Sequence, residues 1–322
     1  MSEKEFYISP SPHIRSSEST KSIMLTVVIA MLPAVAWSVY AFGMSALTIM
    51  LTAVVSCVLF EYLIDRFLMN NNSDGRSVLD LSAVVTGILL GFNLPSTLPI
   101  WIVMVGALFA MGVAKMSFGG LGTNLFNPAL AGRVFLLISF PAPMTSWVLP
   151  VDGTTGATPL GLIKEAMRSG DISSVSLPSL TDMFFGLSSG SLGEVSALML
   201  IIGGVYMLSR KVITWHIPVS VLGSIVILSG ILWLINPNLY MNPLTQVLSG
   251  GAMLGAIFMA TDMVTSPMTQ KGQIIFGVGI GILTVCIRAF GSYPEGISFA
   301  ILLMNAAVPL INKYVKPSRF GK

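Results

Sequence analysis

The chain has 322 residues, of which 54% are hydrophobic and only 10% charged, and its formal net charge is +3. Soluble globular domains carry about 25% charged residues, so this composition excludes a water-soluble enzyme, a disordered protein and a nucleic-acid-binding protein. Much of the apolar surface must face lipid. The two cysteines, Cys57 and Cys286, lie far apart in apolar runs. Their spacing matches no metal-binding or iron–sulfur motif and indicates two core residues.

Ten apolar runs approach the length of about 20 residues that a membrane-spanning helix needs. The fifth, sixth and eighth are short, which predicts tilted, extended or half-spanning segments. The predicted fold class is therefore an all-α polytopic membrane protein with about ten transmembrane helices. The runs cover residues 23–43, 45–62, 78–94, 98–116, 128–140, 195–208, 213–235, 247–260, 274–290 and 297–315.

Basic residues predict the orientation, because cytoplasmic loops retain Lys and Arg. With the N-terminus inside, 14 of the 17 basic residues are cytoplasmic and only Lys164, Arg168 and Arg288 lie outside. We therefore expect both termini in the cytoplasm of a bacterial or archaeal cell, with the chain in the inner membrane. The first run lacks a small-residue cleavage site and is interpreted as a retained helix rather than a signal peptide.

Five parts follow from this division of the chain. A cytoplasmic N-terminal segment precedes a first five-helix half, and an extracytoplasmic loop insertion separates it from a second five-helix half and a cytoplasmic tail. Since loops of this length between spans commonly have a task or are disordered, the insertion is a candidate functional region. The parts cover residues 1–22, 23–140, 141–194, 195–315 and 316–322.

An internal repeat relates residues 78–134 to residues 250–306 at an offset of 172. The matched positions are Pro95 with Pro267, Phe118-Gly119 with Phe290-Gly291, and Lys115 with a place next to Arg288. Five spans per half would give the halves opposite orientations. Inverted repeats with broken helices are typical of transporters, with the site at the repeat interface. A chance likeness between two polytopic halves stays open as the alternative.

The exterior loop contains the sequence Asp-Gly-Thr-Thr-Gly-Ala-Thr at positions 152–158. Gly153 and Gly156 allow a tight turn, and Pro159 keeps Thr158 out of a helical conformation. A threonine hydroxyl is a weak nucleophile without an adjacent base, and no histidine is near in sequence, so no catalytic residue is predicted here. Two interpretations stay open: a turn with a helix N-cap, or an acceptor for a group that another enzyme attaches.

A second polar segment, at residues 119–133, contains Gly120, Asn124 and Asn127. The glycine permits close backbone approach, and the asparagines supply hydrogen-bonding groups. Non-helical backbone at membrane depth is tolerated where it is buried or lines a cavity, and a flavin ring or a dehydrated cation would suit such a lining. A cytoplasmic turn followed by helix packing on small residues is the open alternative.

The corresponding break in the second half, at residues 261–270, carries Asp262 and Thr265. Ionisable groups near the membrane interior are functional candidates, so we assign these two residues to a possible ion path. A helix cap, or a pairing of Asp262 with Lys271, stays open. The chain has no predicted metal site and no Walker or Rossmann fingerprint, so NAD chemistry belongs to a partner chain.

The loop sequence resembles the flavinylation motif Asp-Gly-x-Ser/Thr-Gly/Ser-Ala-Thr, in which a flavin transferase joins FMN to the last threonine through a phosphoester. The matching residues are Asp152, Gly153, Thr155, Gly156, Ala157 and Thr158. Segments 9–14, 119–133, 260–272 and 290–296 resemble the D subunit of the Rnf electron-transport complex, nearly from end to end. The B subunit of the sodium-translocating NADH:quinone oxidoreductase is a similar relative. Its longer N-terminal extension favours the Rnf resemblance here.

The resemblance implies a membrane flavoprotein in a complex that passes electrons between ferredoxin and NAD and moves Na+ or H+. FMN would be covalently attached to Thr158, and a non-covalent riboflavin would lie in the membrane part, with Gly120, Asn124 and Asn127 as candidate contacts. The implied partners are a second flavinylated subunit, small membrane subunits, Fe–S and NAD-binding subunits, and a flavin transferase.

Two other classes compete with this interpretation. The inverted-repeat plan also resembles urea-transporter-like solute channels without redox activity, and a purely structural membrane anchor would need no loop motif. The sequence at 152–158 discriminates, because neither alternative requires it.

Overall fold

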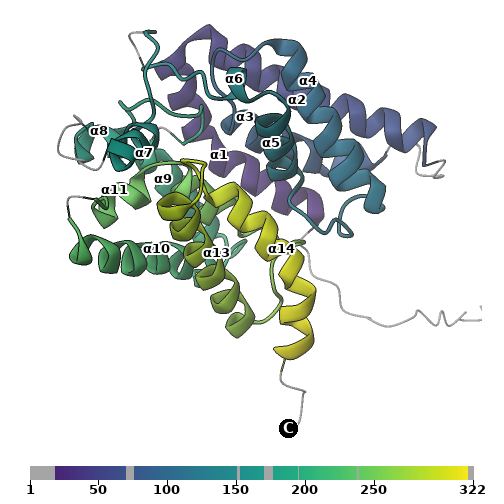
Figure 1. The fold of residues 1–322 in the computed structure, drawn as a ribbon. Helices are drawn as coiled ribbons and strands as arrows, with labels where there is room; N and C mark the ends of the chain where they lie inside the picture. The colour runs from purple at the N-terminus through teal and green to yellow at the C-terminus, as the bar shows by residue number, and fades with distance from the viewer. Residues whose placement is uncertain are drawn as a thin grey trace, which may run out of the picture.

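The computed structural model describes residues 19–69, 76–150, 153–169, 177–194, 196–237 and 239–317. These residues form helices joined by turns, and their one β-type pairing is an isolated antiparallel bridge between Val148 and Thr155. The predicted all-helical fold is confirmed for this part of the chain. Figure 1 shows the helices of residues 20–139 gathered on one side and those of the C-terminal half on the other.

The N-terminal half contains five apolar helical segments. They are α1 (Thr20–Phe42), α2 (Met44–Phe67), α3 (Ser82–Phe92), α4 (Ile100–Leu108) with its continuations η2 (Phe109–Lys115) and η3 (Met116–Phe118), and α5 (Pro128–Ser139). A 3-10 turn, η1 (Arg76–Asp80), precedes α3. The region between the halves forms three short helices, α6 (Pro141–Met144), α7 (Pro159–Ser169) and α8 (Leu180–Phe185).

The C-terminal half contains long helices and short helical segments. They are α9 (Ala197–Ser209), α10 (His216–Ile235), α11 (Pro243–Leu248), α12 (Ala252–Leu254) with its continuation η5 (Gly255–Met259), α13 (Gln270–Phe290) and α14 (Ile297–Tyr314). Helices α7, α8 and α11 lie together at one edge of the molecule (Figure 1).

Six helices in the described ranges are long and apolar enough to cross a membrane. They are α1, α2, α4 with its continuations, α10, α13 and α14. Three further apolar helices, α3, α5 and α9, are shorter. The chain is therefore a multi-pass membrane protein, and six of the ten predicted spans have the full length.

The third predicted span, residues 78–94, is shorter than expected. Leu81 has a left-handed backbone (φ 66°), and the Asp80 carboxylate accepts from the Ser82 N–H at 2.7 Å, so the helix begins only at Ser82. It ends at Asn93, whose side chain donates to the Leu89 carbonyl. Eleven residues reach about 16 Å, half of the hydrocarbon thickness.

Small residues let the longer helices pack closely. A Cβ atom built on Gly203 of α9 would lie 2.1 Å from the Ala30 carbonyl oxygen of α1. On α13, Gly277 and Gly281 face the Ser220 and Ser224 side chains of α10. Close backbone contact of this kind is typical of helix association in lipid, where no hydrophobic force draws helices together.

Candidate functional site

The loop motif forms a tight turn that leads into α7. Gly153 has a positive φ of 66° and donates to the Leu149 carbonyl, and Gly156 donates to the Trp147 carbonyl. Thr155 is exposed. Asp152, the first motif residue, lies outside the described residues.

Thr158 is the N-cap of α7, because its Oγ1 accepts from the Gly161 N–H at 3.1 Å. Thr158 is only 6% exposed, although an acceptor for an attached group requires an accessible hydroxyl. The preceding residue is fixed as well, since the Ser189 hydroxyl donates to the Ala157 carbonyl at 2.5 Å. The turn must open slightly before an enzyme can modify this hydroxyl. A phosphoester there would lie at a helix N-terminus, which favours negative charge.

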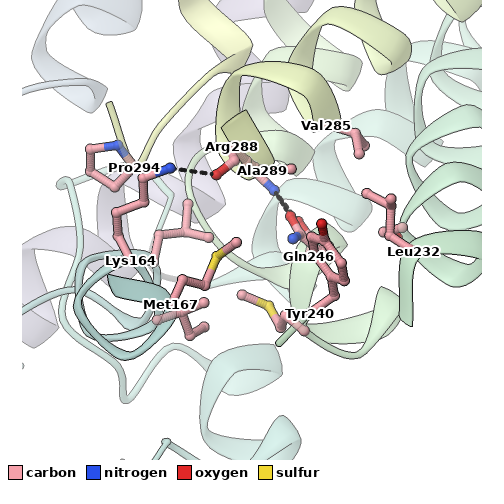
Figure 2. Close-up of a pocket in the computed structure, with 13 residues that line it drawn as sticks. Lys164, Met167, Leu232, Tyr240, Gln246, Val285, Arg288, Ala289 and Pro294 are labelled. Carbon is pink, nitrogen blue, oxygen red and sulfur yellow. Dashed lines mark hydrogen bonds between the residues drawn. The ribbon is translucent and has the colours of Figure 1, made fainter. Parts of the chain in front are cut away.

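An outer cavity of about 20 Å³ lies beside α7, between α10, α11 and α13. Leu160, Ile163, Lys164 and Met167 line it from one face of α7 (Figure 2). The Lys164 ammonium donates to the Arg288 carbonyl at 2.9 Å. This face begins two residues after Thr158, so the cavity lies near the C-terminal end of the motif. A larger and more open hollow of about 750 Å³ lies at the other end, where Gly153 lines it.

Arg288 of α13 forms the polar wall of this outer cavity. Arg288 is one of the three basic residues that the orientation argument places outside, and it is only 3% exposed. The guanidinium donates to the Gln246 carbonyl and side-chain oxygens and to the carbonyls of Ser249 and Gly250. These bonds close the C-terminus of α11, immediately before the left-handed residues Gly250 and Gly251.

An inner cavity of about 90 Å³ lies between the two halves of the chain. Asn124, Asn127, Lys115 and Asp262 contribute its polar groups, and side chains of α1, α3 and α9 contribute its apolar wall. Gly120 does not line it, although its φ of 94° confirms that the predicted turn needs glycine there. Sequence reasoning thus identified three of these four polar residues.

Asn127 joins the two halves. Its side-chain oxygen accepts from the N–H groups of Ala129 and Leu130 and so caps α5, while its amide donates to the Met259 carbonyl at 3.2 Å. The amide nitrogen of Asn124 donates to the Phe126 carbonyl at 3.1 Å.

Asp262 and Thr265 form one local turn, and Asp262 lines the inner cavity. The Thr265 hydroxyl donates to Asp262 Oδ2 at 3.0 Å, and the Val264 N–H donates to Oδ1 at 3.4 Å. Burial raises the pKa of the Asp262 carboxyl, because a low dielectric disfavours its charge. Asp262 therefore caps a turn and also presents a protonatable group to the cavity.

Lys115 is buried against this cavity with a partner that the sequence interpretation missed. Its ammonium lies 2.7 Å from Glu61 Oε1 and donates to the Ser82 hydroxyl at 2.6 Å. Both charged side chains are about 1% exposed. The sequence signal that could have identified this partner is Glu61 itself, an acidic residue four positions before Asp65 in an otherwise apolar helix.

A central polar cluster around Arg133 was also missed. Arg133 donates to Asn93 at 2.7 Å and to Ser298 at 2.8 Å, and it pairs with Glu295. Burial, together with the nearby charge of Glu295, raises the pKa of Glu194 to about 7. A buried arginine in an otherwise apolar run was the available signal, since membrane-buried charges are paired.

The comparisons with known proteins give a consistent answer. The model of the NQR2, RnfD, RnfE family matches residues 7–321. The chain belongs to this family. It is 46% identical to the D subunit of the Na+-translocating ferredoxin:NAD+ oxidoreductase complex of Acetobacterium woodii, over 100% of this chain and 97% of that protein.

Two further relatives agree along their whole length. The D subunit of the proton-translocating ferredoxin:NAD+ oxidoreductase complex of Clostridium ljungdahlii is 42% identical over 98% of this chain and 96% of its own. The D subunit of the ion-translocating oxidoreductase complex of Escherichia fergusonii is 37% identical over 98% of both chains. The resemblance to the Rnf D subunit expected from the sequence is confirmed.

Proposed function

We propose that this chain is the D subunit of an ion-translocating ferredoxin:NAD oxidoreductase and carries electrons through FMN bound covalently to Thr158. The observation that carries the proposal is the motif at residues 152–158 in a member of the NQR2, RnfD, RnfE family. Its last residue, Thr158, is the N-cap of α7. FMN would supply one-electron or two-electron transfer. No complete site for NAD chemistry is expected in this chain.

The residues around Thr158 fit a phosphate ester. The hydroxyl oxygen already accepts from the Gly161 N–H in the first turn of α7, and the positive end of the helix would stabilise phosphate oxygens. The ester would hold the flavin at an exterior loop and leave the redox-active ring free. Gly153 has open space around it, so this end of the turn can move when the buried hydroxyl is modified.

The polar groups of the inner cavity suit a non-covalent riboflavin. The polar edge of a flavin alternates hydrogen-bond donors and acceptors, and Asn124 and Asn127 each carry both kinds of group. The Asn124 and Asn127 side chains are about 6% and 2% exposed, so binding would remove little water from them. The 90 Å³ cavity would have to widen to hold the ring.

Two features support ten spans arranged as an inverted repeat. The left-handed residues Leu81 and Gly251 directly precede α3 and α12, each the start of a short helical segment. The buried cations Lys115 and Arg288 each bond to the chain at the start of these segments. With both termini cytoplasmic, the Thr158 loop would face outward and the inner cavity inward, in the cell's inner membrane.

An ion path past Asp262 and Thr265 is proposed because Asp262 lines the inner cavity and Thr265 bonds to its carboxylate. The relatives named above include both a Na+-translocating and a proton-translocating complex, so the transported cation is Na+ or H+. The proposed partners are a second flavinylated subunit, small membrane subunits, Fe–S and NAD-binding subunits, and a flavin transferase.

The experiment compares Thr158→Ala with the control Thr155→Ser in a strain that has an active flavin transferase. The wild-type chain and the control are expected to fluoresce under ultraviolet light on a denaturing gel, and Thr158→Ala to lose the band. Intact mass should show one added FMN residue on the wild type. A fluorescent Thr158→Ala chain would refute the attachment site, and a wild-type chain without flavin would favour the solute-channel alternative.

A further inference from the structure

A basic cleft of about 240 Å³ lies between the start of α1 and the turn that joins α9 to α10. Its polar lining comes from both elements and consists of Ser22, Thr26, Ser209, Arg210 and Lys211. The two charged residues in this lining are both cations. In the described part of the chain, no carboxylate oxygen lies within 4 Å of either side chain. The cleft therefore presents two positive charges that no neighbouring acid neutralises.

The basic cleft lies at the depth of the lipid headgroups. Helix α1 is long and apolar enough to cross a membrane, and its 23 residues extend over about 35 Å. The hydrocarbon core of a bilayer is about 30 Å thick, so the first turn of α1, which contains Ser22, lies at its edge. Helix α9 ends at Ser209 on the same side, since both residues line the cleft. Phospholipid headgroups therefore surround this end of the two helices.

Exposed apolar side chains continue from the basic cleft along the same helix faces. On α1, Leu25 and Ile29 follow Ser22 by three and seven positions, and both are exposed. On α9, the exposed Val205 precedes Ser209 by four positions. Residues at these spacings share one face of a helix, and α1 packs against α9. The faces that line the cleft thus also offer apolar surface to acyl chains.

We propose that the basic cleft binds the phosphate headgroup of an anionic phospholipid, whose acyl chains lie against the exposed faces of α1 and α9. Basic pockets between membrane-spanning helices recognise anionic lipids through their charge. Phosphatidylglycerol has a net negative headgroup, whereas the choline of phosphatidylcholine cancels the phosphate charge, so the cleft should select the former. At about 30 Å³ for each water-sized group, the cleft has room for the five heavy atoms of a phosphate.

The position of the basic cleft gives such a lipid a structural consequence. Ile23 and Val212 line both the cleft and the inner cavity. A headgroup that bridges Arg210 and Lys211 to the start of α1 would therefore stabilise one wall of the inner cavity. With the proposed orientation of the chain, the lipid belongs to the cytoplasmic leaflet. The inference does not depend on a flavin at Thr158.

The competing explanation is that Arg210 and Lys211 only fix the orientation of the chain, as basic residues of cytoplasmic loops do. Charges with that role are interchangeable with other cations on the same side, whereas charges in a binding site are not. Lys271 and Lys313 are exposed and do not line the basic cleft, and the orientation argument assigns them to the same side. The double variant Lys271→Gln/Lys313→Gln is therefore a control with the same loss of charge.

The test uses the full chain, purified in dodecyl maltoside and freed of lipid. Microscale thermophoresis gives the Kd for dioctanoyl phosphatidylglycerol and for dioctanoyl phosphatidylcholine, and the phosphatidylglycerol titration is repeated with sodium phosphate in place of sodium chloride at equal ionic strength. The site variants are Arg210→Gln/Lys211→Gln and Lys211→Gly. Lys211 has a left-handed backbone (φ 57°), which glycine adopts without steric cost, so Lys211→Gly removes the charge without straining the turn. Circular dichroism and size-exclusion profiles report folding.

We expect the wild-type chain to bind phosphatidylglycerol at least about tenfold more tightly than phosphatidylcholine, and each charge removed from the cleft to weaken phosphatidylglycerol binding about fivefold. Lys211→Gly should therefore lose about fivefold and Arg210→Gln/Lys211→Gln about twentyfold, whereas Lys271→Gln/Lys313→Gln should change the Kd less than about twofold. Equal losses in the site and control double variants, or no preference for phosphatidylglycerol, would overturn the inference. Complete displacement of phosphatidylglycerol by inorganic phosphate would also overturn it, because the cleft would then be a site for free anions.

Discussion

Breaking the buried ion pair between Lys115 and Glu61 is expected to destabilise the membrane domain strongly. The two charged atoms lie 2.7 Å apart, and both side chains are about 1% exposed. Lys115→Met would leave Glu61 without its cation, and Oε2 of that carboxylate already has no partner. Removing one member of a buried pair costs about 3–5 kcal/mol, and we expect each of Lys115→Met and Glu61→Gln to fall in this range.

The double variant Lys115→Met/Glu61→Gln should recover at least about 2 kcal/mol, since it leaves no uncompensated charge. The free energy of unfolding is measured in mixed SDS micelles by tryptophan fluorescence, with the exposed Lys271→Met as a control that changes it by less than about 0.5 kcal/mol. A double variant as unstable as the sum of the two single variants would refute the reasoning, because it would show that the pair is not coupled.

Two further predictions concern packing and pH. Gly203→Ala should lower the free energy of unfolding by about 1–3 kcal/mol, because the added Cβ would meet the Ala30 backbone of α1. Gly223 has open space around it. Gly223→Ala should therefore be neutral or stabilising by about 0.5–1 kcal/mol in the same unfolding assay. The raised pKa of Glu194, about 7 against an ordinary 4.5, means that the folded chain holds this proton more tightly than the unfolded chain. Its contribution to stability therefore falls as pH rises from about 4.5 to 7. Glu194→Gln should be more stable than wild type at pH 8 and equal to it at pH 4, and an equal difference at both pH values would contradict this assignment.

Apolar periodicity and length predicted the long helices, because lipid imposes a uniform requirement on every spanning segment. The same argument failed at residues 78–94. That run is apolar enough to span, but a left-handed Leu81 and the side chain of Asp80 delay the helix start. Hydropathy averages over residues, and a single backbone conformation at one of them does not change the average.

The site was predictable where chemistry is local and was missed where it depends on distant contacts. The turn at Gly153 and the cap formed by Asn127 follow from adjacent residues. The burial of Thr158 depends on tertiary packing around the motif, including the segment fixed by Ser189, which is 31 positions further along the chain. No window of the sequence around the motif contains that information.

The buried polar groups give a better test of the proposed repeat than the aligned Phe-Gly pairs do. Arg133 of α5 bonds to Asn93, at the end of α3 in its own half. At an offset of 172, these two positions become Asn305 and Thr265. With its amide nitrogen turned toward the carbonyls, Asn305 of α14 donates to the Thr265 carbonyl at 3.2 Å. A chance likeness between apolar helices would not be expected to place a buried donor on the residue at the polar break in both halves. The side chains differ, an arginine in one half and an asparagine in the other, and only the arginine brings a charge that Glu295 must balance. If the two halves are the proposed inverted repeat, they keep a buried donor at the corresponding position but differ in its charge and in the group that accepts from it.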